Sequence, residues 1–302
     1  MSRIHEALKK AAQERSARVG ANNQTDIFDV AVDVKRTPDK TEELPEQESK
    51  GVITAEEAAP HSFEELIKCC PRPSWEPTEQ NRVFQDTGDD GPAAERFHTL
   101  RSRLSQIAAV RPLRQVVVTS SVPAEGKTFI AANLAKSMAR QPDKRVLLID
   151  GDMRASRLHR VLGAPQKPGL SDYLGGELDL LKVMQQGPEG NLYFIPGGSN
   201  IANPSDLLLN EGMKKLLELV TPMFDWVILD SPPALPVHDA SMLADLCDGV
   251  LFVVRAGATS YEIAEKAVAE FRQKNLIGVV LNRIQSGEGY DGYYYRGELT
   301  NK

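Results

Sequence analysis

Residues 115–128 read QVVVTSSVPAEGKT, and this stretch decides the fold of the chain. Positions 116–118 are three consecutive valines, the composition of a short buried strand. A loop that ends in Gly126 follows, and after it come a Lys-Thr pair at 127–128 and the helical pattern FIAANLAKSMAR. The order of strand, loop, Lys-Thr and helix is typical of a phosphate-binding P-loop.

A P-loop holds nucleotide phosphates with its backbone N–H groups and the N-terminus of the following helix. Lys127 is expected to contact the β- and γ-phosphates, and the Thr128 hydroxyl is expected to bind Mg²⁺. Ser121 stands where the usual motif has its first glycine. The residues predicted to contact the nucleotide here are Pro123, Ala124, Glu125, Gly126, Lys127, Thr128 and Phe129.

Two further apolar stretches end in aspartate. Asp150 closes the strand-like part of RVLLIDGDMR, and Asp230 closes that of FDWVILDSPP. The C-terminal ends of parallel strands lie along one edge of a sheet, the edge that also carries the P-loop. A single such aspartate could simply form a turn, but two of them after a P-loop favour a metal-binding site. The predicted Mg²⁺ ligands are therefore Thr128, Asp150 and Asp230.

Composition bounds the class of protein. The chain has 302 residues, of which 41% are hydrophobic, and a net charge of -6, so nucleic-acid binding is not expected. No apolar run reaches the roughly 18 residues that a membrane span needs, and no signal peptide opens the sequence. The three cysteines fit neither a disulfide framework nor a zinc site, which favours a reduced cytoplasmic protein.

The N-terminal third differs from the rest of the chain. Residues 1–18 have the pattern of a helix with one thin apolar stripe and excess positive charge, which fits a solvated helix or one that docks on a partner or an anionic membrane; we favour a protein partner. Residues 19–90 carry about ten net negative charges and few large apolar side chains, so a disordered acidic linker is expected. Within it, HSFEELIKCC could form one or two helical turns, and Cys69 and Cys70 receive no role.

The globular domain is expected to span residues 91–286 and to fold without the residues before it. Apolar strands are predicted at 145–150, 192–195, 226–230, 250–255 and 277–282, in addition to the valine strand. Helices are predicted at 93–110, 203–220, 239–246 and 260–274, with short helical pieces in the segment that starts at 169. This alternation predicts an α/β fold, a mostly parallel P-loop-type sheet with helices on both faces.

A flexible tail is expected over residues 287–302. It contains Tyr290, Tyr293, Tyr294 and Tyr295, which are four of the seven tyrosines of the chain. Such a cluster could form an aromatic interface, but its place beside a nucleotide site favours phosphate acceptors.

Taken together, these motifs resemble the bacterial tyrosine kinases of exopolysaccharide and capsule synthesis. The resemblance rests on SVPAEGKT, which lacks the signature lysine of the partition and cell-division ATPases, on LLIDGDMR, on VILDSPP and on YDGYYY. It covers residues 92–302, whereas the opening MSRIHEALKKA resembles the cytoplasmic tyrosine autokinases of exosortase-linked loci.

The resemblance implies an assembly and partners. Family members form rings through a helix motif whose positions here are Glu95, His98 and Arg101, with histidine in place of the middle arginine. The expected partners are other copies of the chain, which phosphorylate one another in trans, a membrane-spanning chain-length-determinant adaptor and a tyrosine phosphatase. The implied location is cytoplasmic, peripheral at the inner membrane through that adaptor.

The implied reaction transfers the γ-phosphoryl group of ATP to tyrosine, with Mg²⁺ as cofactor. The predicted catalytic residues are Lys127, Asp150, Asp152 and Asp230, and Asp152 is the candidate proton acceptor. Arg154 could bind a phosphate or pair with one of these carboxylates. Asn282 and Arg283 are placed to contact adenine, although Asn282 could instead be a turn residue.

Two other functions compete with this interpretation. The chain could be a partition- or cell-division-type ATPase that recruits a partner and hydrolyses ATP with water, but the missing signature lysine and the tyrosine tail argue against it. It could also be a regulatory binding module with a degenerate loop. The presence of Lys127, Thr128 and the three aspartates disfavours that alternative.

Overall fold

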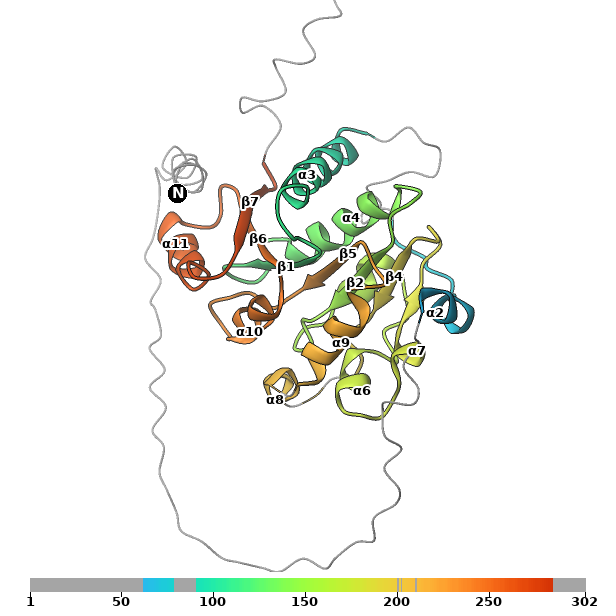
Figure 1. Ribbon diagram of the computed structural model, residues 1–302. Coiled ribbons are helices and arrows are strands. Elements are labelled where there is room, and N and C mark those ends of the chain that lie inside the picture. The colour runs from blue at the N-terminus through green and yellow to red at the C-terminus, as the bar shows by residue number, and fades with distance from the viewer. Residues whose placement is uncertain (1–61, 79–90, 200, 202, 210, 285–302) are drawn as a thin grey trace, which may run out of the picture.

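The computed structural model describes residues 62–78, 91–199, 201, 203–209 and 211–284. The predicted helix at 1–18, most of the predicted linker and the tail at 287–302 lie outside these described residues. In the described part, one central sheet is covered by helices on both faces, as the sequence predicted (Figure 1).

Seven strands form this sheet in the order β3-β4-β2-β5-β1-β6-β7. All neighbouring strands are parallel except β3 and β4, which are antiparallel. The six apolar strands lie where the sequence predicted them, and the two-residue β3 is too short to give a pattern. The strands are β1 (Gln115–Ser120), β2 (Val146–Asp150), β3 (Gln185–Gln186), β4 (Leu192–Ile195), β5 (Trp226–Asp230), β6 (Gly249–Arg255) and β7 (Leu276–Asn282).

Alternate side chains of the central strands pack into two separate hydrophobic cores, one on each face of the sheet. Val116 and Val118 point into one core, and Val117 points into the other, because side chains alternate across a strand. The first core is covered by α3 (Pro92–Ala108), α4 (Lys127–Ala139) and α5 (Leu158–Leu162). The second is covered by α6 (Leu170–Leu174), α7 (Leu180–Val183), α8 (Pro204–Leu209), α9 (Gly212–Val220), α10 (Asp239–Leu246) and α11 (Tyr261–Ala269).

The helix predicted over 203–220 is in fact two helices, α8 and α9. Gly212 begins α9, and glycine in the middle of a helix costs about 1 kcal/mol relative to alanine. The continuous apolar pattern of this segment therefore concealed a break. Among the described residues no helix is both long enough and apolar enough to span a membrane.

The prediction of a mostly disordered linker over 19–90 is wrong for residues 62–78, which we call the strap, although the sequence had allowed one or two helical turns in HSFEELIKCC. The strap begins with α2 (Phe63–Cys69) and continues as an extended segment along the β3–β4 edge of the sheet (Figure 1). Leu66 is fully buried in one core, whereas Trp75, with 8% of its surface exposed, belongs to the other. The strap therefore passes around the edge of the sheet and contributes to both of its faces.

Backbone hydrogen bonds fix the strap to the domain. Gln186 N donates to Pro71 O at 2.8 Å, and Glu76 N donates to Gly163 O at 3.0 Å. A β-carbon at Gly163 would lie 2.1 Å from the backbone of Glu76, so the strap fits closely there. Its apolar residues follow neither a helical nor a strand period over the whole segment, which is why composition alone suggested disorder.

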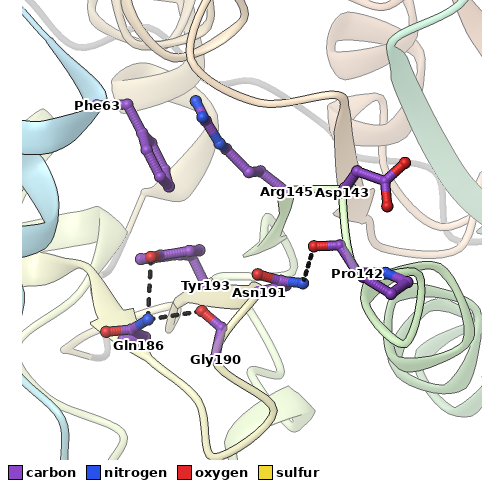
Figure 2. Close-up of a pocket in the computed structure, with 8 residues that line it drawn as sticks. All are labelled: Phe63, Pro142, Asp143, Arg145, Gln186, Gly190, Asn191 and Tyr193. Atoms are coloured by element: carbon purple, nitrogen blue, oxygen red, sulfur yellow. Dashed lines mark hydrogen bonds between the residues drawn. The ribbon is translucent and has the colours of Figure 1, made fainter.

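A cavity of about 450 Å³ lies where the strap meets the N-terminal ends of β2 and β4 (Figure 2). The Arg145 guanidinium stacks over the Phe63 ring at 3.9 Å from its centroid. Gln186 Nε2 donates to Tyr193 Oη at 3.0 Å and to Gly190 O at 2.6 Å. This cavity adjoins the N-terminal ends of the strands. It therefore lies on the opposite side of the sheet from the P-loop, which follows the C-terminal end of β1.

We predict that the strap stabilises the domain substantially. Trp75→Ala should lower the free energy of unfolding of the full chain by about 3–4 kcal/mol, because it removes a buried indole that packs edge-on against Phe194. Urea unfolding followed by circular dichroism measures this loss. The matched control is Ser74→Ala at an exposed position, expected within about 0.5 kcal/mol of the unmodified chain. Equal stabilities for the two variants would mean that the strap does not stabilise the domain.

Candidate active site

Strand register brings the acidic strand ends together. Asp150 of β2 and Asp230 of β5 are paired neighbours, and Asp230 is also paired with Val118 of β1. The loop after β1 leads into α4, which begins at Lys127. The P-loop and both aspartates therefore lie at the same edge of the sheet, as the sequence predicted.

The P-loop has an unusual backbone at two positions. Gly126 has a φ of 99°, and a β-carbon there would lie 2.0 Å from Asn282 Nδ2, so glycine is required. Ala124 has a φ of 66°, in the left-handed region that a residue with a β-carbon adopts at a cost of about 1–2 kcal/mol. Ala124 is therefore held in a strained conformation.

Lys127 lies among three buried aspartates. Its Nζ is 2.8 Å from Asp152 Oδ2 and 4.0 Å from Asp230 Oδ1. Asp150 and Asp230 are fully buried, and Asp152 is 3% exposed. One amine thus faces three carboxylates that have little access to water.

The two strand-end aspartates differ in their hydrogen bonds. Asp150 Oδ2 accepts from Ser156 Oγ at 2.7 Å and from Leu158 N at 3.2 Å. Neither oxygen of Asp230 accepts a well-formed hydrogen bond within the described residues, although Lys127 and the Thr128 hydroxyl lie nearby. Asp230 is therefore a buried carboxylate whose oxygens can accept further bonds.

Burial dominates the titration of this cluster. It raises the pKa of Asp150 to about 7, and repulsion from Asp230 adds to the effect. Burial likewise raises the pKa of Asp230 to about 6, while the Lys127 ammonium opposes the shift. The pKa of Lys127 is raised even though burial acts to lower it, because Asp230 and Asp152 favour its charged form.

These residues fit a bound Mg²⁺. Magnesium prefers carboxylate, hydroxyl and water oxygens, and a divalent cation would balance the negative charge that Lys127 leaves uncompensated. The unpartnered oxygens of Asp230, with Asp150 and the Thr128 hydroxyl close by, supply such a donor set. The predicted metal ligands thus lie together, although their assignment to Mg²⁺ stays a prediction.

Arg154 pairs with a carboxylate that the sequence did not single out. Its Nε donates to Asp239 Oδ2 at 2.7 Å, and its Nη2 donates to Ser205 Oγ at 2.6 Å. Asp239 is the first residue of α10, and Ser205 belongs to α8. In this structure Arg154 thus links the loop after β2 to two helices, and does not pair directly with Asp150, Asp152 or Asp230 as the sequence had left open.

Three residues predicted to contact the nucleotide also use their side chains for contacts within the domain, and their contact with the nucleotide stays a prediction. The Glu125 carboxylate accepts from Thr259 Oγ1, which lies in the segment after β6. Asn282 Nδ2 donates to Glu125 O at 2.8 Å, and Asn282 Oδ1 accepts from Arg283 N at 2.9 Å. The Phe129 ring packs edge-on against Phe97 of α3. Both ends of the Asn282 amide are therefore engaged, and a contact with adenine would require the amide to give up a bond.

The predicted interface residues also make contacts within the chain. His98 Nδ1 lies 3.5 Å from Glu95 Oε2. Arg101 Nη1 donates to Ser137 O at 2.6 Å, which ties α3 to α4. Arg101 is thus directed at its own domain in this structure, and its role between copies stays a prediction. The four tail tyrosines lie outside the described residues.

Sequence reasoning missed several residues that shape the site. Ser156 holds Asp150, Asp239 anchors Arg154, and Thr259 holds Glu125. Ser156 and Asp239 lie in loops or at helix starts with no periodic signal. Thr259 follows β6 within the segment GATSYE, where its proximity to the P-loop depends on β6 lying next to β1.

We predict that Asp230→Asn stabilises the protein in buffer without nucleotide or Mg²⁺. The folded-state pKa of Asp230 is raised from 3.8 to about 6, so the charged form costs stability above pH 6, and this cost fades as the pH falls toward 4. The variant should be more stable by about 1–2 kcal/mol at pH 7.5, after the cost of burying an amide. Its advantage should shrink at pH 5, as measured by denaturant unfolding.

The control for this substitution is Asp206→Asn at an exposed position of α8. It should leave the stability nearly unchanged at both pH values. A gain for Asp230→Asn that did not depend on pH would contradict the buried-charge interpretation.

Known proteins share this domain. Residues 117–274 match the family model described as AAA domain. The tyrosine-protein kinase YwqD of Bacillus subtilis strain 168 is 33% identical over 220 residues, which cover 71% of this chain and 92% of YwqD. The kinase domain of the Escherichia coli tyrosine kinase Etk has 30% identity and a TM-score of 0.60, over 74% of this chain and 93% of that domain.

Other relatives are much longer. The tyrosine-protein kinase Wzc of Salmonella typhimurium is 35% identical over 207 residues, which cover 67% of this chain but 28% of Wzc. The chain likewise spans 27% of the length of EpsB of Ralstonia nicotianae. The match to YwqD over nearly its whole length is therefore the most informative of these. The chain belongs to the family of bacterial tyrosine-protein kinases, as its motifs had indicated.

Proposed function

We propose that this chain is an ATP-dependent protein-tyrosine autokinase that transfers the γ-phosphoryl group of ATP to tyrosines of its own C-terminal tail. The observation that carries the proposal is the position of Lys127, which lies at the P-loop among three buried aspartates. Relatives with the same domain are named tyrosine-protein kinases. By the same resemblance, the reaction would regulate the polymerisation and export of an exopolysaccharide or capsule.

The P-loop and Lys127 would bind the phosphates of ATP. The loop amides and the N-terminus of α4 would donate to the phosphates, and Lys127 would exchange its bond to Asp152 for bonds to the β- and γ-phosphates. Thr128, Asp150 and Asp230 would hold Mg²⁺, which supplies charge neutralisation at the phosphate oxygens when it is bound.

Asp152 would accept the proton of the attacking tyrosine. A bond forms between the tyrosine oxygen and the γ-phosphorus while the bond from that phosphorus to the β–γ bridging oxygen breaks, and ADP leaves. Tyrosine has an unperturbed pKa near 10, so its proton must leave during the transfer. Asp152 would become available for this proton once Lys127 turns to the phosphates, because Lys127 is the group that now occupies its Oδ2 atom.

The tail and the partners complete the proposal. Tyr290, Tyr293, Tyr294 and Tyr295 would be the acceptors, and transfer would occur in trans, because β7 ends at Asn282 and leaves few residues for a reversal into the same site. Copies would assemble as a ring with the help of Glu95 and Arg101. A membrane-spanning chain-length-determinant adaptor would place the kinase peripherally at the inner membrane, and a tyrosine phosphatase would reverse the modification.

A mixing experiment tests the activity and its direction together. One chain carries Lys127→Met and keeps its tail tyrosines, while the other is active but has four phenylalanines at the tail positions. With ATP and Mg²⁺, the Lys127→Met chain should gain phosphotyrosine, detected by immunoblot and mass spectrometry. Adding Asp152→Asn to the active chain should lower this rate about 100-fold with little change in ATP affinity, because a base acts in the transition state.

The control omits the active chain, and the Lys127→Met chain alone should then stay unmodified. Release of inorganic phosphate without phosphotyrosine would contradict the kinase proposal and favour the partition-type ATPase. Phosphotyrosine on an unmodified chain, but never on the Lys127→Met chain in the mixture, would contradict transfer in trans.

A further inference from the structure

Glu125 is a buried carboxylate inside the P-loop. It is 1% exposed and stands directly before Gly126 and Lys127. A negative charge so close to a site for nucleotide phosphates would repel them, and burying a charge without partners is costly. The burial of a carboxylate at this position therefore needs an explanation other than contact with the nucleotide.

Three donors inside the protein account for its burial. Val122 N donates to Oε2 at 2.8 Å, whereas Thr259 Oγ1 and Arg255 N donate to Oε1 at 2.5 Å and 3.3 Å. An ionised carboxylate only accepts hydrogen bonds, and bonds to a charged acceptor are stronger than neutral ones. The side chain thus connects the start of the P-loop to the C-terminal end of β6 and the turn after it.

The backbone of Glu125 is held as well, by the end of β7, which lies next to β6 in the sheet. Its carbonyl accepts from Asn282 Nδ2 at 2.8 Å, and Asn282 is the last residue of β7. The neighbours on either side, Ala124 and Gly126, have φ angles of 66° and 99°. A strained alanine conformation persists only where surrounding contacts enforce it. Glu125 is the next residue after Ala124, so its hydrogen bonds are the contacts best placed to enforce the conformation of Ala124.

We infer that Glu125 is a positioning residue, which fixes the P-loop in its phosphate-binding conformation by joining it to the ends of β6 and β7. The loop amides then face the phosphate site before the nucleotide arrives, so binding costs less ordering of the loop. Thr259 and Asn282 belong to the same device, one through the carboxylate and one through the carbonyl. The inference rests on the proposed function for the identity of the ligand, ATP.

Thr259 offers the cleanest test, because it touches the carboxylate and has no assigned contact with the nucleotide. Thr259→Val keeps the shape of this buried side chain and removes its hydroxyl, whereas Thr259→Ser keeps the hydroxyl. Thr259→Val should weaken ATP binding roughly tenfold, because it removes one hydrogen bond to a charged group. The KM for ATP should rise by a similar factor with a smaller change in kcat, because the loop holds the phosphates in both ground and transition states.

A second substitution separates positioning of the loop from general stability. Glycine adopts the left-handed region freely, so Ala124→Gly reduces the need for the contacts of Glu125. In the Thr259→Val background it should restore several-fold of the lost ATP affinity. If Thr259 only stabilised the domain, adding Ala124→Gly to Thr259→Val would not change the affinity for ATP. The reason is that Ala124 is exposed and contributes little to the core.

Calorimetry of the full-length variants with Mg²⁺ and ATP, followed by steady-state kinetics, decides the matter. Tenfold weaker binding in Thr259→Val, recovery in Thr259→Ser and partial recovery with Ala124→Gly support the inference. Equal affinity for the unmodified chain and Thr259→Val overturns it and leaves the proposed function intact. Failure of Thr259→Ser to recover binding also overturns it. Absence of ATP binding by the unmodified chain would overturn the proposed function and this inference together.

Discussion

The interaction on which the site depends is the contact of Lys127 with buried aspartates. Among the described residues, Lys127 is the ion-pair partner of both Asp152 and Asp230. Asp150 instead accepts hydrogen bonds from Ser156 and Leu158. Burial raises the pKa of Asp150 and of Asp230, and Lys127 is one positive charge among three buried carboxylates. A divalent cation would supply further positive charge, and its nucleotide would supply the phosphates that Lys127 is proposed to bind.

The sheet makes this arrangement possible. Because β5 lies between β1 and β2, the strand that carries Asp230 stands beside both the P-loop and the strand that carries Asp150. The strand on the other side of β1, β6, brings Thr259 and Arg255 to the Glu125 carboxylate. The P-loop is thus held by contacts on both flanks, in keeping with the strained conformation of Ala124.

The sequence predicted those features that depend on local pattern. Continuous apolar runs located six strands, and the P-loop with two aspartates at strand ends located the site, because parallel strands bring their C-terminal ends to one edge. Features that depend on contacts distant in sequence were not predictable. The strap has no uniform period, and the partners of Arg154 and Arg101 depend on how helices lie relative to one another.

Two residues predicted to contact the nucleotide, Glu125 and Asn282, have polar partners inside the protein that the sequence did not reveal. A polar residue near a nucleotide site is easily assigned to the ligand, although a buried polar group first needs partners inside the protein. Glu125 and Asn282 bond to each other in this way, because the side-chain amide of Asn282 donates to the backbone carbonyl of Glu125. Only the fold, which places the end of β7 beside the P-loop, brings these two residues into contact.

The central claim is that the buried carboxylates need a cation that arrives together with the nucleotide. Its most direct test is the stability of the unmodified chain at pH 7.5 with ADP alone, Mg²⁺ alone or both, measured by denaturant unfolding. The account predicts that the two together stabilise the protein by more than the sum of their separate effects, since each reduces the charge cost of binding the other. Equal stabilisation by ADP with and without Mg²⁺ would contradict it.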